Sequence, residues 1–162
     1  MAAHAKPLKP VPKLVVGWRE WVGLPALGVA RVKAKIDTGA RTSSIHAWDI
    51  EAFRRGGASW VRFEIRPLQG EDRTRVECEA PVADERLVRS SSGHAEQRLV
   101  IATTLSLGEG AWPIELALAR RDEMGFRMLI GRTALKRRAV VDPSRSFVCS
   151  SRDAPRRPRR KG

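Results

Sequence analysis

The chain has little of what would support a disulfide-linked or membrane-spanning protein. Its 162 residues include two cysteines, Cys78 and Cys149, which are too few for a disulfide scaffold. Free cysteine behaves as a small apolar residue, so we expect both thiols to be buried and unpaired. No apolar run reaches the roughly 18 residues that a membrane helix needs, and no charged-then-apolar leader opens the chain. We therefore expect a cytoplasmic protein without membrane contact.

Motifs for metal and nucleotide binding are also missing. The histidines are His4, His46 and His94, widely separated and without an H-E-x-x-H pattern, and no G-x-x-x-x-G-K-[ST] loop is present. We expect no metal site and no cofactor, and we expect His46 to be a hydrogen-bonded structural residue. The sequence also shows no internal repeat and only one D-T-G motif.

Positive charge is concentrated at the two ends of the chain. The net charge is +13, and residues 1–13 with 150–162 hold nine of the 31 basic residues but one of the 18 acidic ones. Both ends contain proline and few large apolar groups, which predicts disordered extensions around a single domain at residues 14–149. The C-terminal extension could contact RNA phosphates or an acidic protein, or it could be a solvated end without a task.

The body of the chain is typical of an all-β barrel or sandwich, because short alternating segments are separated by turn residues. Helical patterns occur only at residues 49–55, followed by Gly56-Gly57, and at 132–136. The predicted strands are residues 14–21, 28–36, 44–47, 60–66, 74–80, 87–89, 98–107, 112–119, 127–129, 139–141 and 146–148.

A lone carboxylate follows the second of these strands, in the string Asp37-Thr38-Gly39-Ala40. The Thr38 hydroxyl can fix the loop and Gly39 permits close approach, as an aspartate that holds a water requires. These are also ordinary turn residues, so the string alone leaves a simple turn as the alternative. A second string, Met128-Leu129-Ile130-Gly131-Arg132, lies about ninety positions downstream.

Together the two strings resemble the retropepsins, the single-domain aspartic proteases. More closely, the chain is similar to a bacterial retropepsin-like family often labelled as ATP-dependent zinc proteases. The similarity covers residues 14–149 and extends to the stretches 16–22, 35–43, 93–94, 127–132 and 141–146.

This resemblance implies a closed acid-protease-like barrel with one active-site loop per chain, and hence a homodimer. Two carboxylates must share a proton and hold a water, and a chain with one such aspartate can supply the pair only with a symmetry mate. The implied catalytic residues are Asp37, Thr38 and Gly39, with Gly131 and Arg132 supporting the loop. A hairpin flap at residues 89–98 would cover a peptide substrate, which would contact Ala40, Arg41, Ser92, Gly93 and His94.

Arg41 departs from the family pattern, which usually has an acidic residue just after the motif. We therefore expect Arg132 to pair with Asp142 or Glu20 instead, and Arg41 to favour acidic substrates. Family members often accompany ATP-grasp ligases that append glutamates, which implies a processing role on acidic tails. Two alternatives stay open: a zinc-dependent protease, and an inactive module that binds RNA or an acidic partner through its basic tails.

Overall fold

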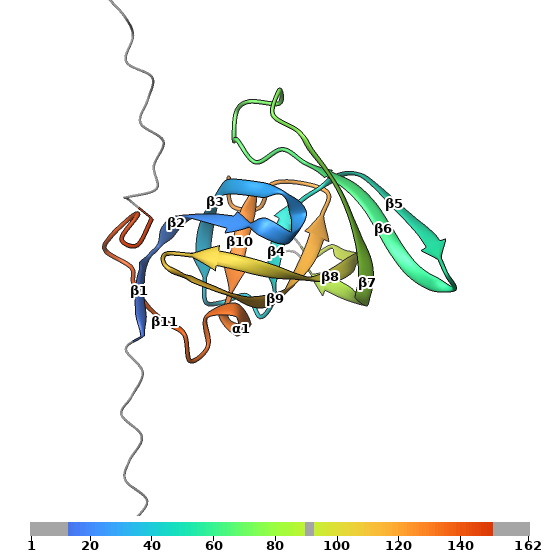
Figure 1. Ribbon diagram of the computed structural model, residues 1–162. Helices are drawn as coiled ribbons and strands as arrows, with labels where there is room; N and C mark the ends of the chain where they lie inside the picture. Colours follow the sequence, from blue (N-terminus) through green and yellow to red (C-terminus); the bar gives the residue numbers. More distant parts are fainter. Residues whose placement is uncertain (1–12, 90–92, 151–162) are drawn as a thin grey trace, which may run out of the picture.

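A computed structural model describes residues 13–89 and 93–150, and strands dominate it, so the all-β prediction is confirmed (Figure 1). The described helices are a 3-10 turn, η1 (Pro25–Leu27), and one short α-helix, α1 (Arg132–Leu135). The strands are β1 (Leu14–Gly17), β2 (Arg19–Leu24), β3 (Val29–Asp37), β4 (Ser43–His46), β5 (Trp48–Arg55), β6 (Ala58–Ile65), β7 (Val76–Arg89), β8 (Ala95–Leu107), β9 (Gly110–Ala119), β10 (Met128–Gly131) and β11 (Ala139–Asp142).

Nine strands form one sheet in the order β2-β3-β10-β4-β9-β8-β7-β6-β5. Gly23 of β2 also pairs with Ser106 of β8. β2 is therefore hydrogen-bonded both to its neighbour β3 and to β8, which lies further along the sheet order. β10 is parallel to β3, and β4 is parallel to β9, whereas the hairpins are antiparallel. β1 and β11 form a separate parallel pair beside this sheet (Figure 1).

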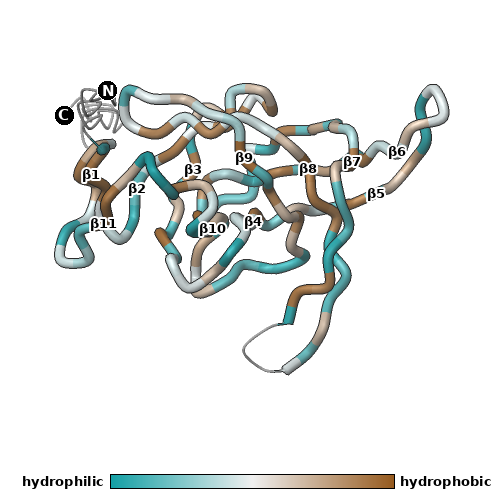
Figure 2. Tube along the Cα trace, turned by 90° about the horizontal axis from the view of Figure 1, so that it is seen from below, coloured by the Kyte–Doolittle hydropathy of each residue, from teal (hydrophilic) through white to brown (hydrophobic). Residues whose placement is uncertain are grey.

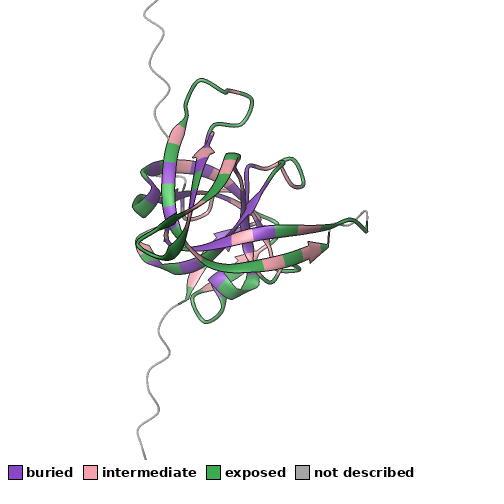
Figure 3. Ribbon diagram, turned by 90° about the vertical axis from the view of Figure 1, so that its right-hand side faces the viewer, coloured by how far each residue is buried: buried purple, intermediate pink, exposed green. Residues whose placement is uncertain are grey.

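The core lies inside the ring of strands, and alternation along each strand selects its members. Val32, Ala34 and Ile36 of β3 are buried in the same hydrophobic cluster as Leu116 and Leu118 of β9. Burying one such large side chain contributes about 1.5–3 kcal/mol. The buried positions gather at the centre, while the β5–β6 and β7–β8 hairpins project from it with more exposed and hydrophilic residues (Figures 2 and 3).

The prediction of helix at residues 49–55 is wrong, because this segment is strand β5. It pairs antiparallel with β6 across a turn at Gly56 and Gly57, both of which have positive φ. The two glycines therefore form a hairpin turn rather than a helix stop. Phe53 and Trp60 sit opposite each other with ring centroids 6.4 Å apart, which gives the hairpin an aromatic cross-strand pair.

Other strand boundaries also differ from the prediction. The segment at residues 14–21 is divided at Trp18 into β1 and β2, which pair with different partners. The segments at 74–80 and 87–89 belong to one long strand, β7. Residues 146–148 form no strand, because their backbone instead contacts Arg19 and Glu20.

The buried carboxylate of Glu20 fixes the end of the described chain. Glu20 has no solvent exposure and accepts five hydrogen bonds, from the amides of Gly17, Val148, Cys149 and Ser150 and from the Ser150 hydroxyl. Charge-assisted bonds of this kind satisfy both oxygens, which offsets the desolvation of the carboxylate. The segment that ends at Ser150, a residue placed in the tail by the sequence, is thereby held against β2.

Cys78 and Cys149 do not form a disulfide bond with each other. Cys78 is buried, and this burial raises the pKa of its thiol to about 11, so the thiol stays protonated near neutral pH. Cys149 is half-buried, less than the sequence predicts. None of the helices described is long and apolar enough to cross a membrane.

Replacing Glu20 with glutamine should lower the free energy of unfolding by about 3 kcal/mol or more, because an amide cannot accept all five bonds. Urea denaturation monitored by circular dichroism measures this loss. Glu109→Gln, at an exposed site, is the matched control and should change stability by less than about 0.5 kcal/mol. Equal stability of the two variants would contradict the anchoring role of Glu20.

Candidate active site

Asp37 ends strand β3 and begins a tight loop. Its Oδ1 atom accepts a hydrogen bond from the Gly39 amide at 3.1 Å, and its carbonyl accepts one from Ala40 at 3.2 Å. Asp37 is half-buried, while Thr38 and Gly39 are exposed. The loop therefore presents a carboxylate whose orientation is fixed by the backbone and whose surroundings are open to a ligand.

The segment after β10 holds this loop from the other side. The Arg132 amide donates to the Ala40 carbonyl at 2.8 Å, and the Thr133 amide and hydroxyl donate to the Arg41 carbonyl at 3.2 and 2.6 Å. The Ser43 hydroxyl accepts from the Gly131 amide at 3.0 Å. The two strings singled out in the sequence are thus bonded directly to each other.

Gly131 packs so closely on the loop that no side chain fits. A Cβ atom there would lie 2.7 Å from the carbonyl carbon of Thr42 and 2.9 Å from the carbonyl oxygen of Arg41. Both neighbours are backbone atoms and cannot turn away, so a larger residue would displace the loop.

Arg132 has a different partner from the two expected. Its Nη1 atom donates to the Gly39 carbonyl at 3.1 Å. The Glu20 carboxylate already accepts hydrogen bonds from residues near the end of the described chain, for example the Ser150 hydroxyl. Asp142 accepts hydrogen bonds from the hydroxyl and the amide of Ser144, and these bonds lower the pKa of Asp142. The predicted pairing with either acid is therefore wrong, and the guanidinium instead supports the Asp37 loop directly.

A groove of about 550 Å³ opens beside the loop. Three of its lining residues are cations, Arg41, Arg132 and Lys136, and three others are apolar. Arg41 is exposed. The lining residues are Thr38, Arg41, Arg132, Thr133, Leu135, Lys136, Ala139 and Val141.

The predicted flap coincides with the β7–β8 hairpin, in which Arg89 pairs with Ala95 and Gly93 has positive φ. Ser92 lies outside the described residues. The hairpin projects from the sheet (Figure 3). Arg86 joins the base of this hairpin to the segment after the Asp37 loop, because it donates to the Thr42 hydroxyl at 3.2 Å. Arg86 also pairs with Glu115 at 2.6 Å, and this bond raises the pKa of Arg86.

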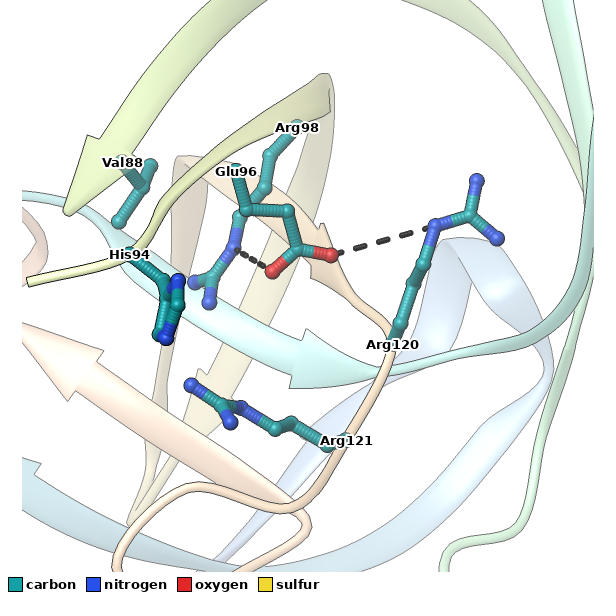
Figure 4. A pocket seen from close by; sticks show the side chains of 6 residues that line it. All are labelled: Val88, His94, Glu96, Arg98, Arg120 and Arg121. Atoms are coloured by element: carbon teal, nitrogen blue, oxygen red, sulfur yellow. Dashed lines mark hydrogen bonds and ion pairs between the residues drawn. The ribbon is translucent and has the colours of Figure 1, made fainter. Parts of the chain in front are cut away.

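A second cavity, of about 280 Å³, lies on this hairpin and was not foreseen from the sequence. It is lined by Val88, His94, Glu96, Arg98, Arg120 and Arg121. Glu96 lies between Arg98 and Arg120, at 3.4 and 3.9 Å, as Figure 4 shows. The cavity therefore has more cations than carboxylates. Its residues come from β7, the β7–β8 turn, β8 and the turn after β9, a combination that no local pattern indicates.

His46 is hydrogen-bonded, as predicted. Its Nδ1 lies 2.6 Å from the Asp122 carboxylate, and its ring stacks on Trp48 with centroids 3.5 Å apart. Arg127 pairs with the same Asp122 at 3.1 Å. Across residues 13–89 and 93–150 no three histidine, cysteine or acidic side chains are grouped to hold a metal ion.

Comparison with known proteins identifies the family. The chain belongs to the RimB-like family, described as the retropepsin-like aspartic endopeptidase RimB, whose model matches residues 15–152.

Similar curated proteins carry the name probable alpha-L-glutamate ligase. The one from Shewanella pealeana is 50% identical over 135 residues, and the one from Desulfotalea psychrophila is 48% identical over 134 residues. Each match covers 83% of this chain but only 30% and 29% of those proteins. The chain thus spans about a third of the length of the relatives it matches.

A solved structure has the same fold. The protein Lpg0085 of unknown function from Legionella pneumophila superposes with a TM-score of 0.69 at 23% identity, covering 86% of this chain and all of that one. At this identity the likeness concerns the fold alone.

Gly131→Ala should displace the Asp37 loop, since the added methyl group would overlap the backbone of Thr42. We expect the variant to lose about 1–3 kcal/mol of stability. Amides 39–43 should also exchange faster with deuterium than in the original chain. Unchanged exchange and an unchanged melting temperature would show that the contact does not fix the loop.

Proposed function

We propose that the chain is an aspartic endopeptidase of the retropepsin type, acting as a two-fold dimer with a closed barrel in each subunit. The observation that carries this proposal is the Asp37 loop, which is held by Gly131, Arg132 and Thr133 while its carboxylate stays accessible. The family match supports the same activity. The catalytic residues are Asp37 with Thr38 and Gly39 in each subunit.

The dimer follows from the number of catalytic aspartates. The chain has one D-T-G motif, so a second carboxylate must come from a symmetry-related copy. The β1–β11 pair offers an apolar surface for this contact: Val15 and Val140 are neighbours in register and are 45% and 52% exposed. Ala139 and Val141 of the same strand line the groove beside Thr38, so the contact would lie next to the catalytic loop.

In this dimer the two Asp37 carboxylates act as one titrating unit. Their proximity prevents both from ionising together, so that one is the general base toward water and the other protonates the substrate carbonyl. The Gly39 amide, bonded to Oδ1, holds the Asp37 carboxylate in one orientation. The flap hairpin, with Gly93 and His94, would exclude water from the bound peptide.

Acidic, glutamate-rich protein tails are the proposed substrates. Arg41, Arg132 and Lys136 line the groove, and none of its other lining residues that the structure describes carries a carboxylate. Their charges would attract an acidic chain. The names of the glutamate ligase relatives support a functional link to an ATP-grasp ligase, with the peptidase removing what such a ligase adds.

Asp37→Asn tests the proposal directly. Asparagine is nearly isosteric, so the dimer should persist in light scattering, whereas turnover of a glutamate-rich fluorogenic peptide should fall by several orders of magnitude. A mixed dimer with one substituted subunit should also be impaired, because the carboxylates act together.

Full activity of the doubly substituted dimer would refute the role of Asp37. The zinc alternative predicts instead that a chelator abolishes cleavage in the original chain and that zinc alone restores it. An inactive module would cleave no peptide at all.

Arg41→Ala should lower kcat/KM for glutamate-rich peptides by about tenfold or more, because a shielded Arg–carboxylate bond contributes about 1.5–3 kcal/mol. A neutral peptide of the same length is the matched substrate and should be cleaved at nearly the original rate. An equal loss with both peptides would contradict selection by Arg41.

A further inference from the structure

The outer side of the β2–β3 hairpin carries a row of cations without acidic partners. Arg31, Lys33 and Lys35 alternate with the buried residues of β3 and therefore point to the same side, about 6–7 Å apart. Arg19 of β2 stands directly opposite Lys35. Like charges in such cross-strand positions destabilise a sheet. Within the described part of the chain, none of these four residues forms an ion pair, so the row lacks a counter-charge of its own.

Aromatic rings interleave with these cations. The Arg19 guanidinium lies 4.6 Å from the Trp18 ring and 5.0 Å from the Phe147 ring, and Arg31 lies 4.6 Å from Trp21. The rings also contact one another. Trp21 stacks on Phe147 with centroids 6.2 Å apart, and Trp18 packs edge-on against Phe126 at 6.1 Å. The Lys33 ammonium lies over the Phe126 ring, 5.6 Å from its centroid.

We call this surface the basic–aromatic face; it comprises Trp18, Arg19, Trp21, Arg31, Lys33, Lys35, Phe126 and Phe147, all half-buried. The Nε and Nη2 atoms of Arg31 are out of contact with solvent and lack a hydrogen-bond partner among the described residues. Unsatisfied guanidinium donors are unfavourable, so an anion that reached them would be bound with a gain in free energy.

The described part of the chain ends beside this face. Ser150, the last described residue, accepts a hydrogen bond from the Trp21 amide at 2.9 Å. The sequence then continues with Arg152, Arg156, Arg157, Arg159, Arg160 and Lys161. Six further cations thus follow directly from a residue that contacts the face.

We propose that the basic–aromatic face binds single-stranded nucleic acid, with phosphates on Lys33 and Lys35 and bases stacked on the guanidinium planes of Arg19 and Arg31, which the Trp18 and Trp21 rings support. Cations that follow a backbone, interleaved with aromatic platforms for bases, are the general composition of such sites. An acidic polypeptide would use the cations but would gain nothing specific from the rings. The rings therefore favour nucleic acid, and this binding is independent of peptidase activity.

The test measures fluorescence anisotropy of a labelled oligouridine of about 12 nucleotides with the full chain at several salt concentrations. The variant carries Lys33→Glu and Lys35→Glu. The matched control carries Arg54→Glu and Arg55→Glu, which change the charge equally at exposed sites of the projecting β5–β6 hairpin. The first variant should bind at least about tenfold more weakly near 0.1 M salt, and its log–log salt slope should be shallower by about 0.7 per lost phosphate contact. The control should retain most of its affinity, apart from the nonspecific effect of its lower net charge.

Trp21→Leu separates stacking from charge. It should weaken oligouridine binding about fivefold or more with little change of the salt slope, since stacking of a base contributes to affinity without releasing counterions. Circular dichroism melting checks that this variant is folded, and the lysine variant tests the face if it is not.

Three results would overturn the proposal. The first is equal weakening by the lysine variant and its control. The second is full loss of binding on deleting residues 151–162 with no effect of the lysine substitutions, which would assign binding to the tail. The third is equal affinity for a polyglutamate peptide with no effect of Trp21→Leu, which would make the face a general polyanion site.

Discussion

The contact between Gly131 and the backbone of Thr42 is the constraint on which the candidate site depends. β10 runs parallel to β3 and antiparallel to β4, so it lies between the strand that enters the Asp37 loop and the strand that leaves it. The absence of a side chain at Gly131 lets the next two amides reach the carbonyls of Ala40 and Arg41. The orientation of Asp37 is therefore set by residues more than ninety positions away, not by its own loop alone.

The sequence predicts the parts of this arrangement that local patterns encode. Alternation identifies most strands, and two short strings identify the residues that meet at the site. What it misses depends on contacts between distant segments. The strand pattern of β5 is weak because its residues alternate poorly, and its partner β6 decides its conformation. The Arg132 guanidinium finds a carbonyl, Gly39, and no sequence pattern distinguishes a backbone acceptor from a nearby acid.

Glu20, which stabilises the fold, is another residue whose environment the local sequence pattern does not indicate. An acidic residue in an alternating strand reads as a surface position, yet Glu20 is fully buried because the chain returns to it at residues 148–150. The bonds link the first strands to the last described residues. Because β1 and β11 also pair, the two ends of the described chain stabilise each other. The same pairing places the exposed side chains of Val15 and Val140 next to each other.

The distribution of ion pairs leaves positive charge unbalanced at the groove beside the Asp37 loop and on the basic–aromatic face. Acidic residues of the later hairpins neutralise many arginines, for example Glu79 with Arg55 and Arg62, and Glu115 with Arg86. Among the described residues, none that lines the groove beside the Asp37 loop or belongs to the basic–aromatic face is acidic. A single strand, β3, serves both: Arg31, Lys33 and Lys35 point outward along it and Asp37 ends it. Alternation fixes the common side of the three cations, whereas Asp37 is held by its pairing with Gly131 and by the contacts of its own loop. Substitution of the two lysines can therefore change ligand binding on the face while the support of the Asp37 loop stays intact.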